Sequence, residues 1–236
     1  MSRDFSDTAA LFSDPGRAAM LIALMDGRAL PAGQLAMIAN VAPQTASSHL
    51  TKLMEGRILA VEQQGRHRYY RLANIDVAHA IEALLTVASR PNDVAARSTG
   101  GRRTPEAALA YARTCYSHLA GRLGVDIAEA LQVGGFLVKR EDRFAVTQRG
   151  RAWLGQLGIA TSDRQLRNPR FARRCLDWTE RRHHIAGHLG SAMLMRFREL
   201  KWIMPMRDTR AVRVTLEGER KLWELLRVDG REHSRR

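Results

Sequence analysis

The stretch Pro31–Leu72, PAGQLAMIANVAPQTASSHLTKLMEGRILAVEQQGRHRYYRL, decides the fold of the first part of the chain. Its hydrophobic spacing predicts a helix around residues 34–39, a turn at residues 40–42, a second helix from Pro43 and then a β-hairpin with a basic tip. Proline suits the first position of the second helix, because no amide donor is needed there. This order predicts a winged helix-turn-helix, whose second helix enters the major groove of DNA while the hairpin contacts the neighbouring backbone.

The predicted second helix has an apolar face and a polar face. The apolar residues recur at spacings of three and four, which turns them toward the core: Ala46, Leu50, Leu53 and Met54. The residues on or beside the other face are short polar groups, an imidazole and one cation: Gln44, Thr45, Ser47, Ser48, His49 and Lys52. Such groups suit base edges and phosphates, so we assign them to DNA binding. A merely solvated helix face is the alternative, and the adjoining hairpin argues against it.

The predicted hairpin spans residues 58–72, and Gly65 permits a tight turn at its tip. Three basic or titratable residues follow this glycine, where a wing would contact phosphates: Arg66, His67 and Arg68. Tyr69 and Tyr70 point to opposite faces of the strand, so one of them is expected in the core. We assign Tyr70 to the DNA-binding set.

Helices are also predicted on both sides of this motif. Asp14 and Pro15 form a helix cap and first-turn pair ahead of an apolar face, and residues 75–88 form an amphipathic helix after the hairpin. Flanking helices of this kind often pair two copies of a small DNA-binding domain. A homodimer with two-fold symmetry is therefore expected, because palindromic operators mirror that symmetry.

Composition places the chain among ordinary globular proteins, with 236 residues, 45% of them hydrophobic and 26% charged. No apolar run is long enough to cross a bilayer and the N-terminus lacks a signal-peptide core, so we expect a cytoplasmic protein without a membrane partner. The two cysteines, Cys115 and Cys175, imply no disulfide framework.

The net charge of +14 is unevenly distributed. Residues 1–96 carry nine Lys or Arg and nine Asp or Glu, so the whole excess lies in residues 97–236. A basic surface attracts polyanions, so we expect the C-terminal arginines to strengthen DNA binding. The alternative is a solvated surface that happens to be rich in arginine.

The rest of the chain predicts a linker and a duplicated domain. We expect a DNA-binding domain at 1–90, a Ser-, Pro-, Gly- and Arg-rich linker at 91–105 and a C-terminal domain for effector binding or dimerisation at 106–236. Within the last, HLAGRLG at 118–124 matches HIAGHLG at 184–190, 66 residues later. The sequence pattern of each copy predicts a helix, a hairpin and a closing helix.

In these copies Thr147 and Thr215 are expected to cap the closing helices. The predicted fold class is therefore mainly α with small β-hairpin wings (α+β). An N-terminal winged helix-turn-helix would be followed by two winged-helix-like repeats.

Residues 5–88 resemble the ArsR/SmtB family of bacterial transcriptional regulators. The resemblance rests on ALFSDPGRAAMLIAL at 10–24, QTASSHLTKLMEGRIL at 44–59 and GRHRYYRL at 65–72. It implies a homodimer that binds double-stranded operator DNA overlapping a promoter, represses it and lets go when a small effector binds. The remaining half of the chain is similar to a longer branch of that family with an extra C-terminal domain.

The metal sites usual in that family are not matched in this sequence. The cysteine positions before the turn fall on Pro31 and Gly33, and those of the second helix fall on Lys52 and Gly56. The helix after the wing retains only one stripe of possible ligands: Asp76, His79 and Glu82. The resemblance therefore does not imply metal sensing at these positions.

A different set of possible ligands lies in the C-terminal half. Cys115 and His118 are three residues apart, which would place them on one face of a helix. A second segment holds the other candidates: Cys175, His183, His184 and His188. Thiolates and imidazoles together suit a soft metal ion or zinc, although no certain cofactor is implied.

Other interpretations of these residues remain open. The cysteines could be redox-active thiols, or small buried residues, which is the usual fate of a free cysteine. His118 and His184 occupy equivalent places in the two copies, so each could satisfy a backbone group, with an organic ligand between the copies.

The sequence as a whole predicts a DNA-binding transcriptional regulator, a dimeric repressor, with a metal- or thiol-responsive sensor as the alternative. An enzyme using Cys115 as nucleophile and His118 as base is a remote alternative, because no Gly-rich phosphate loop or nucleophile elbow accompanies them. We therefore expect no enzymatic activity. A protein-interaction module built on the same scaffold would not need Lys52, Arg66 and Arg68.

Overall fold

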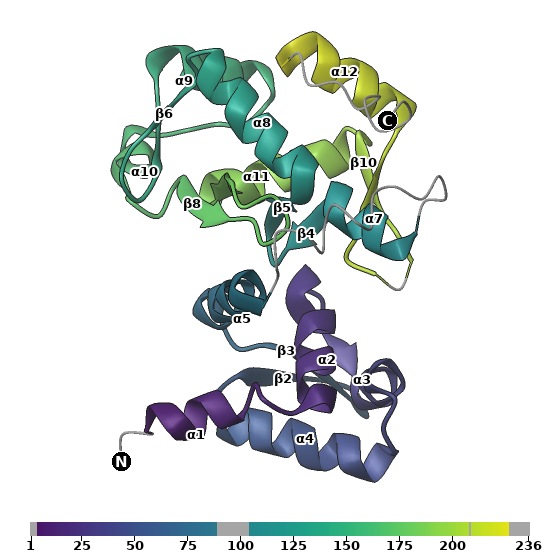
Figure 1. Ribbon diagram of the computed structural model, residues 1–236. Helices are drawn as coiled ribbons and strands as arrows, with labels where there is room; N and C mark the ends of the chain where they lie inside the picture. Colours follow the sequence, from purple (N-terminus) through teal and green to yellow (C-terminus); the bar gives the residue numbers. More distant parts are fainter. Residues whose placement is uncertain (1–3, 89–103, 208, 227–236) are drawn as a thin grey trace. The chain divides into compact units, whose positions relative to one another are not determined.

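The computed structural model describes residues 4–88, 104–207 and 209–226, and the chain divides into two compact units (Figure 1). Unit 1 is Met1–Ile81 and unit 2 is Glu82–Arg236. The predicted linker at 91–105 falls mostly on residues 89–103, which lie outside the described residues, while Thr104 caps the first helix of the next segment. Helices joined by short antiparallel hairpins make up both units, which confirms the predicted fold class. In the part of the chain described here, none of the helices has the length and apolar character needed to cross a membrane.

Unit 1 has the element order of a winged helix-turn-helix. Its elements are α1 (Phe5–Ala10), α2 (Pro15–Ala23), the 3-10 helix η1 (Leu24–Asp26), β1 (Leu30–Pro31), α3 (Ala32–Ala39), α4 (Pro43–Glu55), β2 (Leu59–Gln64) and β3 (His67–Leu72). Helix α5 (Ile75–Ala88) follows and continues across the boundary between the units at Ile81. The Asp14 side chain accepts a hydrogen bond from the Arg17 amide at 2.9 Å, which confirms the predicted cap. Asn40 ends α3 in the left-handed conformation at φ 51°, so the chain reverses direction before α4 begins.

A three-stranded sheet and the inner faces of α2, α3 and α4 enclose the core of unit 1. The strands lie in the order β1-β3-β2, all antiparallel, with Leu59 opposite Leu72 and Leu30 opposite Tyr70. Fully buried leucines and methionines from the helices and the sheet fill the interior: Met20, Leu21, Leu24, Met25, Leu35, Leu50, Leu53 and Leu72. This core holds α4 in a fixed position with its other face outward.

Unit 2 is built from two copies of one sequence of elements. The first copy is α7 (Pro105–Tyr111), β4 (Arg113–Cys115), β5 (His118–Ala120), α8 (Gly121–Val133), β6 (Leu137–Lys139), β7 (Phe144–Val146) and α9 (Gln148–Gln156). The second is α10 (Asp163–Arg167), β8 (Arg173–Leu176), β9 (His183–Ala186), α11 (Gly187–Glu199), β10 (Ile203–Pro205), β11 (Val212–Val214) and α12 (Leu216–Leu226). Thr147 and Thr215 accept hydrogen bonds from the Gly150 and Gly218 amides, which confirms both predicted caps. Each copy has one hairpin more than the sequence predicts, at β4–β5 and at β8–β9.

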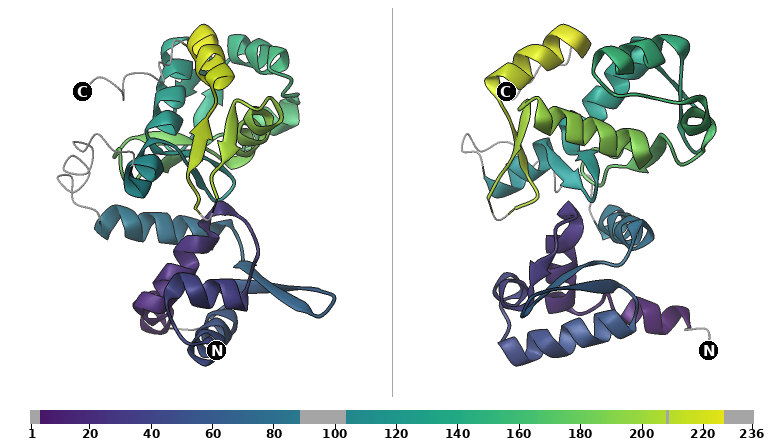
Figure 2. Two further views of the ribbon diagram at one scale, coloured as in Figure 1. Left: turned by 90° about the vertical axis from the view of Figure 1, so that its right-hand side faces the viewer. Right: turned by 180° about the vertical axis from the view of Figure 1, so that it is seen from behind.

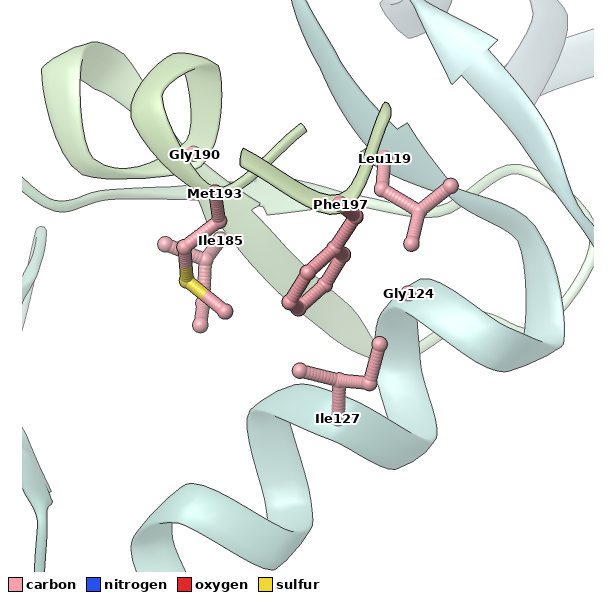
Figure 3. A pocket seen from close by; sticks show the side chains of 7 residues that line it. All are labelled: Leu119, Gly124, Ile127, Ile185, Gly190, Met193 and Phe197. Atoms are coloured by element: carbon pink, nitrogen blue, oxygen red, sulfur yellow. The ribbon is translucent and has the colours of Figure 1, made fainter. Parts of the chain in front are cut away.

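Each copy packs its long helix against a hairpin of the other copy. Helix α8 of the first copy contacts β9 of the second, α11 contacts β5, and β5 lies against β9. One hydrophobic cluster runs through both copies and includes Leu123, Leu189 and Phe197. At its centre an apolar cavity of about 20 Å³ is lined from both copies, among others by Ile127 and Met193 (Figure 3). The duplicated segment is therefore one folded body.

Candidate DNA-reading surface and buried cysteine-histidine cluster

Helix α4 presents its polar side chains to solvent. Ala46, Leu50 and Leu53 are buried on its inner face. The exposed predicted residues are Gln44, Thr45, Ser47, Ser48 and Lys52. In Figure 1 the helix lies along the outer edge of unit 1.

His49 does not belong to this open face, so its assignment to the DNA-binding set is wrong. Its side chain is only 13% exposed, and its Nε2 lies 3.5 Å from Oδ1 of Asp14. A Cβ placed on Gly16 would lie 3.2 Å from the same nitrogen. His49 therefore packs against the start of α2 and positions α4.

The β2–β3 hairpin projects from unit 1 as a wing (Figure 2, left view). Its strands pair in register up to Gln64 opposite His67, and the turn uses Gly65 at φ +60°, where a side chain would be strained. The three predicted residues at the tip are all exposed: Arg66, His67 and Arg68. The wing therefore carries a cationic tip, as the sequence predicts.

Tyr70 does not take part in this surface, and its assignment to DNA binding is wrong. Only 7% of Tyr70 is exposed, because its strand position faces the core on the same side as Leu72. Tyr69, on the opposite face, is half-buried. Arg71 forms an ion pair with Glu62 on the neighbouring strand and donates to the Leu72 carbonyl, so it braces the base of the wing.

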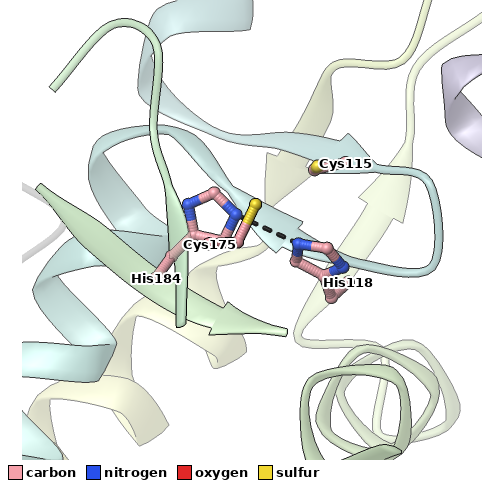
Figure 4. Close-up of side chains that lie close together, drawn as sticks. All are labelled: Cys115, His118, Cys175 and His184. Atoms are coloured by element: carbon pink, nitrogen blue, oxygen red, sulfur yellow. Dashed lines mark hydrogen bonds between the residues drawn. The ribbon is translucent and has the colours of Figure 1, made fainter. Parts of the chain in front are cut away.

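Unit 2 brings four of the predicted ligand residues together in its interior. The thiol sulfurs of Cys115 and Cys175 and a ring nitrogen each of His118 and His184 all lie within 4.8 Å of one another (Figure 4). The two Nε2 atoms are 3.1 Å apart. Both histidines are completely buried, and the cysteines are 1% and 8% exposed. Four soft or borderline donor atoms therefore face one point.

The two extra hairpins create this arrangement. Cys115 is the cross-strand partner of His118, and Cys175 is the cross-strand partner of His184. Each hairpin thus supplies one thiol and one imidazole, side by side on the same face of a strand pair. The expected shared helix face is wrong, because residues 113–120 form a hairpin.

The sequence contains a signal for this arrangement that an alignment at one fixed offset misses. ARTC at 112–115 matches ARRC at 172–175 at an offset of 60, whereas the histidines match at 66. The second hairpin has a connection six residues longer between its cysteine and its histidine. The whole Cys/His pair is therefore duplicated.

Two glycines let the hairpins approach so closely. A Cβ on Gly190 would lie 2.9 Å from the His118 Cβ and 2.3 Å from the Ile185 carbonyl oxygen. At the equivalent position of the first copy, a Cβ on Gly124 would lie 3.5 Å from the His184 Cβ. Each helix therefore leaves room for the histidine of the other copy.

A buried carboxylate in the longer connection holds His184 in place. Oδ2 of Asp177 lies 3.3 Å from Nδ1 of His184. The same carboxylate receives two hydrogen bonds from Arg113, at 2.9 and 3.0 Å, and further ones from the Gly121 and Thr179 amides. Since both Arg113 and Asp177 are fully buried, this bidentate pair fixes the position of the imidazole.

The electrostatics of the cluster follow from these contacts. Burial alone would lower the pKa of His184, but Asp177 and Cys175 raise it to about 9. The Cys115 side chain, hydrogen-bonded to Cys175, lowers the pKa of the Cys175 thiol well below its usual range, and burial lowers the pKa of His118. The cluster therefore favours a thiolate at Cys175.

The other two predicted ligands, His183 and His188, lie outside the cluster. His183 precedes His184 in β9 and points to the other face, where its ring nitrogens lie 3.2 and 3.3 Å from Arg174. His188 is exposed near the start of α11. Their assignment to the ligand set is not supported by this geometry.

A search of known proteins finds a relative along almost the whole chain. The chain is 47% identical over 221 residues to the uncharacterized HTH-type transcriptional regulator YdfF of Bacillus subtilis (strain 168), covering 93% of this chain and 95% of that protein. No protein-family model matches. The relative is a regulator, which confirms the expectation that the chain is not an enzyme.

Solved structures match a smaller part of the chain. The transcriptional repressor BigR from Xylella fastidiosa is 24% identical with a TM-score of 0.33, covering 36% of this chain and 86% of that one. The cadmium metal-sensor CMTR from Mycobacterium tuberculosis is 30% identical with a TM-score of 0.32, covering 36% and 88%. Such likenesses are too loose to say what this chain binds.

Proposed function

This chain belongs to the HTH-type transcriptional regulators, and on that premise we propose that it is a homodimeric repressor that reads operator DNA with α4 and contacts phosphates with its wing. One observation carries the proposal. The face of α4 that is not needed for the core is exposed and polar, and a cationic hairpin tip belongs to the same unit. This combination suits a helix in the major groove with a flanking backbone contact.

The exposed residues divide into two roles. The amide of Gln44 and the hydroxyls of Thr45, Ser47 and Ser48 donate and accept hydrogen bonds, so they can read base edges. Lys52, Arg66 and Arg68 carry full charges and contact phosphates, which supplies affinity without sequence information.

Exposed apolar residues on the flanking helices support the homodimer. Phe5 on α1 is 85% exposed, and Leu84 and Val87 on α5 are 50% and 84% exposed. A partner that covers these side chains would gain the free energy of burying their apolar surface. A two-fold pair would present two α4 helices to half-sites about 34–36 Å apart. In this proposal the regulator acts in the cytoplasm and leaves the operator when a small effector binds.

Titrating fluorescently labelled DNA from upstream of the gene with full-length protein tests the proposal. We expect preference for this DNA over a scrambled duplex of equal length. Lys52→Ala should weaken binding to both and reduce the slope of log affinity against log salt by about 0.9. Gln44→Ala should instead cost about 1–3 kcal/mol on the preferred DNA only, because it removes a base contact.

Arg28→Ala serves as the matched control. It removes one charge from unit 1, but Arg28 lies on neither α4 nor the wing and is already paired with Asp26. Equal affinity of the wild-type protein for both duplexes, or equal losses for Arg28→Ala and Lys52→Ala, would contradict the proposal. Sedimentation of the free protein as a monomer at micromolar concentration would contradict the dimer.

A further inference from the structure

We propose that Cys115, His118, Cys175 and His184 bind one zinc-class divalent ion in tetrahedral coordination, and that this ion ties the two copies of unit 2 together. The inference is independent of DNA reading, because all four residues belong to unit 2 and none lies on α4 or the wing.

The spacing of the donor atoms fits such an ion. Zinc binds nitrogen at about 2.0–2.1 Å and sulfur at about 2.3 Å, so tetrahedral ligands lie about 3.3–3.8 Å apart. The two Nε2 atoms are 3.1 Å apart, and all four donors lie within 4.8 Å of one another. Side-chain shifts of about 1 Å would close the set around the ion.

The chemistry of the donors selects the class of ion. Two thiolates and two neutral imidazoles form the S₂N₂ set that tetrahedral zinc prefers, whereas magnesium and calcium prefer oxygen ligands. Two thiolate charges also neutralise a divalent cation. A neutral complex suits this interior, where both histidines are fully buried and the cysteines nearly so.

The surroundings orient the ligands as a metal site requires. Nδ1 of His184 faces Asp177, so its proton is directed to the carboxylate and the lone pair of Nε2 is directed into the cluster. Asp177 is itself held by Arg113 and by the Gly121 and Thr179 amides. It is therefore a positioning residue for the ligand His184.

The site is closed, which indicates a structural ion. All four positions are supplied by protein side chains, and all four residues are buried away from solvent. Each copy gives one cysteine and one histidine, from hairpins β4–β5 and β8–β9. Neither copy can coordinate the ion alone, so binding crosslinks β4–β5 to β8–β9.

A disulfide or an organic effector explains the cluster less well. A Cys115–Cys175 disulfide would use both thiols and leave two buried imidazoles facing each other at 3.1 Å. The apolar cavity between the copies holds about 20 Å³, far below the roughly 300 Å³ of an ordinary small-molecule pocket.

Elemental analysis and cobalt spectroscopy of the full-length protein test the proposal. Protein purified in reducing buffer should carry about one zinc per chain. After chelation, titration with Co²⁺ should produce the visible bands of tetrahedral cobalt and a thiolate-to-metal charge-transfer band, both saturating at about one equivalent. Absence of these bands, or an intact mass two hydrogens lower without metal, would overturn the proposal.

Ligand variants then assign the donors. Cys175→Ser should weaken the charge-transfer band by about half, since it removes one of two thiolates. His118→Ala should abolish the tetrahedral spectrum, whereas His188→Ala, on the exposed start of α11, should leave it unchanged. Equal spectra for His118→Ala and wild type would overturn the assignment. Where a ligand variant does not fold, the wild-type titration and the His188→Ala control still decide.

Discussion

The two units of this protein place their polar residues in opposite ways. In unit 1 they lie outside: Gln44, Thr45 and Lys52 face solvent on a helix whose other side fills the core. In unit 2 they lie inside: Arg113, His118 and Asp177 are completely buried, and most of their polar atoms meet a named partner. An exposed polar face can be changed at little cost in stability, whereas a buried polar network cannot. The first arrangement is suited to meeting a partner and the second to holding a fold.

Removing the proposed ion should produce the largest difference between the units, measured as their melting temperatures. A structural zinc site contributes up to about 10–16 kcal/mol of apparent binding free energy in small domains, so chelation should lower the melting temperature of unit 2 strongly. Unit 1 should be unaffected, because its core contains none of the ligands. Calorimetry with chelator, followed by zinc addition, measures both transitions. A melting curve that does not change with chelator would contradict the proposal that a metal ion stabilises unit 2.

Asp177→Asn should have the next largest effect. Loss of the carboxylate beside a ligating histidine typically weakens metal affinity about 10–100-fold, and Arg113 loses its charged partner as well. Competition with a chromophoric chelator measures the affinity. Glu180→Gln is the matched control, because Glu180 is a nearby carboxylate that pairs with Arg182 instead. Equal affinities for the two variants would remove Asp177 from the positioning role.

Arg66→Ala combined with Arg68→Ala should change DNA binding and leave folding intact. Two lost phosphate contacts should reduce the salt slope by about 1.8 and weaken binding on the order of tenfold. Both side chains are exposed at the wing tip, so the free energy of unfolding should stay within about 0.5 kcal/mol. Zinc content measured on the same samples should match wild type. A parallel fall in zinc content and DNA affinity would show that DNA binding and metal binding are not independent functions of the two units.

The smallest effect is expected at the cap of α2. Asp14→Ala should cost about 1 kcal/mol, because the Arg17 amide loses its acceptor. Asp14→Asn should keep most of that stability, since asparagine caps equally well. Denaturant unfolding at neutral pH measures both. Equal losses for the two variants would mean that the cap contributes through its charge alone.

Acid titration distinguishes the wild-type Asp14 from the Asp14→Asn variant further. The hydrogen bond from the Arg17 amide lowers the pKa of Asp14 in the folded protein. The contribution of Asp14 is therefore complete above its ordinary pKa and is lost as the pH falls through the lowered value. The Asp14→Asn protein should lack this particular loss on acidification.

Sequence periodicity predicted the elements whose faces alternate regularly. The spacing of Ala46, Leu50 and Leu53 located α4, the predicted helix at 75–88 coincides with α5, and Thr147 marked the start of α9. In each of these cases a local pattern and the tertiary environment demand the same residues. Periodicity failed at Tyr70, because alternation shows that one of the two tyrosines is buried but does not show which one. It failed at His49 because the contact of this residue with Asp14 joins two different helices.

The hairpins that hold the cluster could not be predicted in this way. Their strands are three or four residues long, and β4 and β5 are buried at every position, so no alternation marks them. The turn between them contains Tyr116 at φ 56° instead of a glycine or asparagine. Cys115 and His118 were thus paired correctly from their spacing but for the wrong reason, since the cross-strand register joins them.

The four donors extend from Cys115 to His184, with α8, the β6–β7 hairpin, α9 and α10 between the first pair and the second. During synthesis the first pair leaves the ribosome long before the second has been translated. The cluster can therefore assemble only after nearly four fifths of the chain exists, at position 184 of 236. A chain that ends before that point would expose an unmatched thiol and imidazole, so purified chains truncated before His184 should be less resistant to protease than the full-length protein.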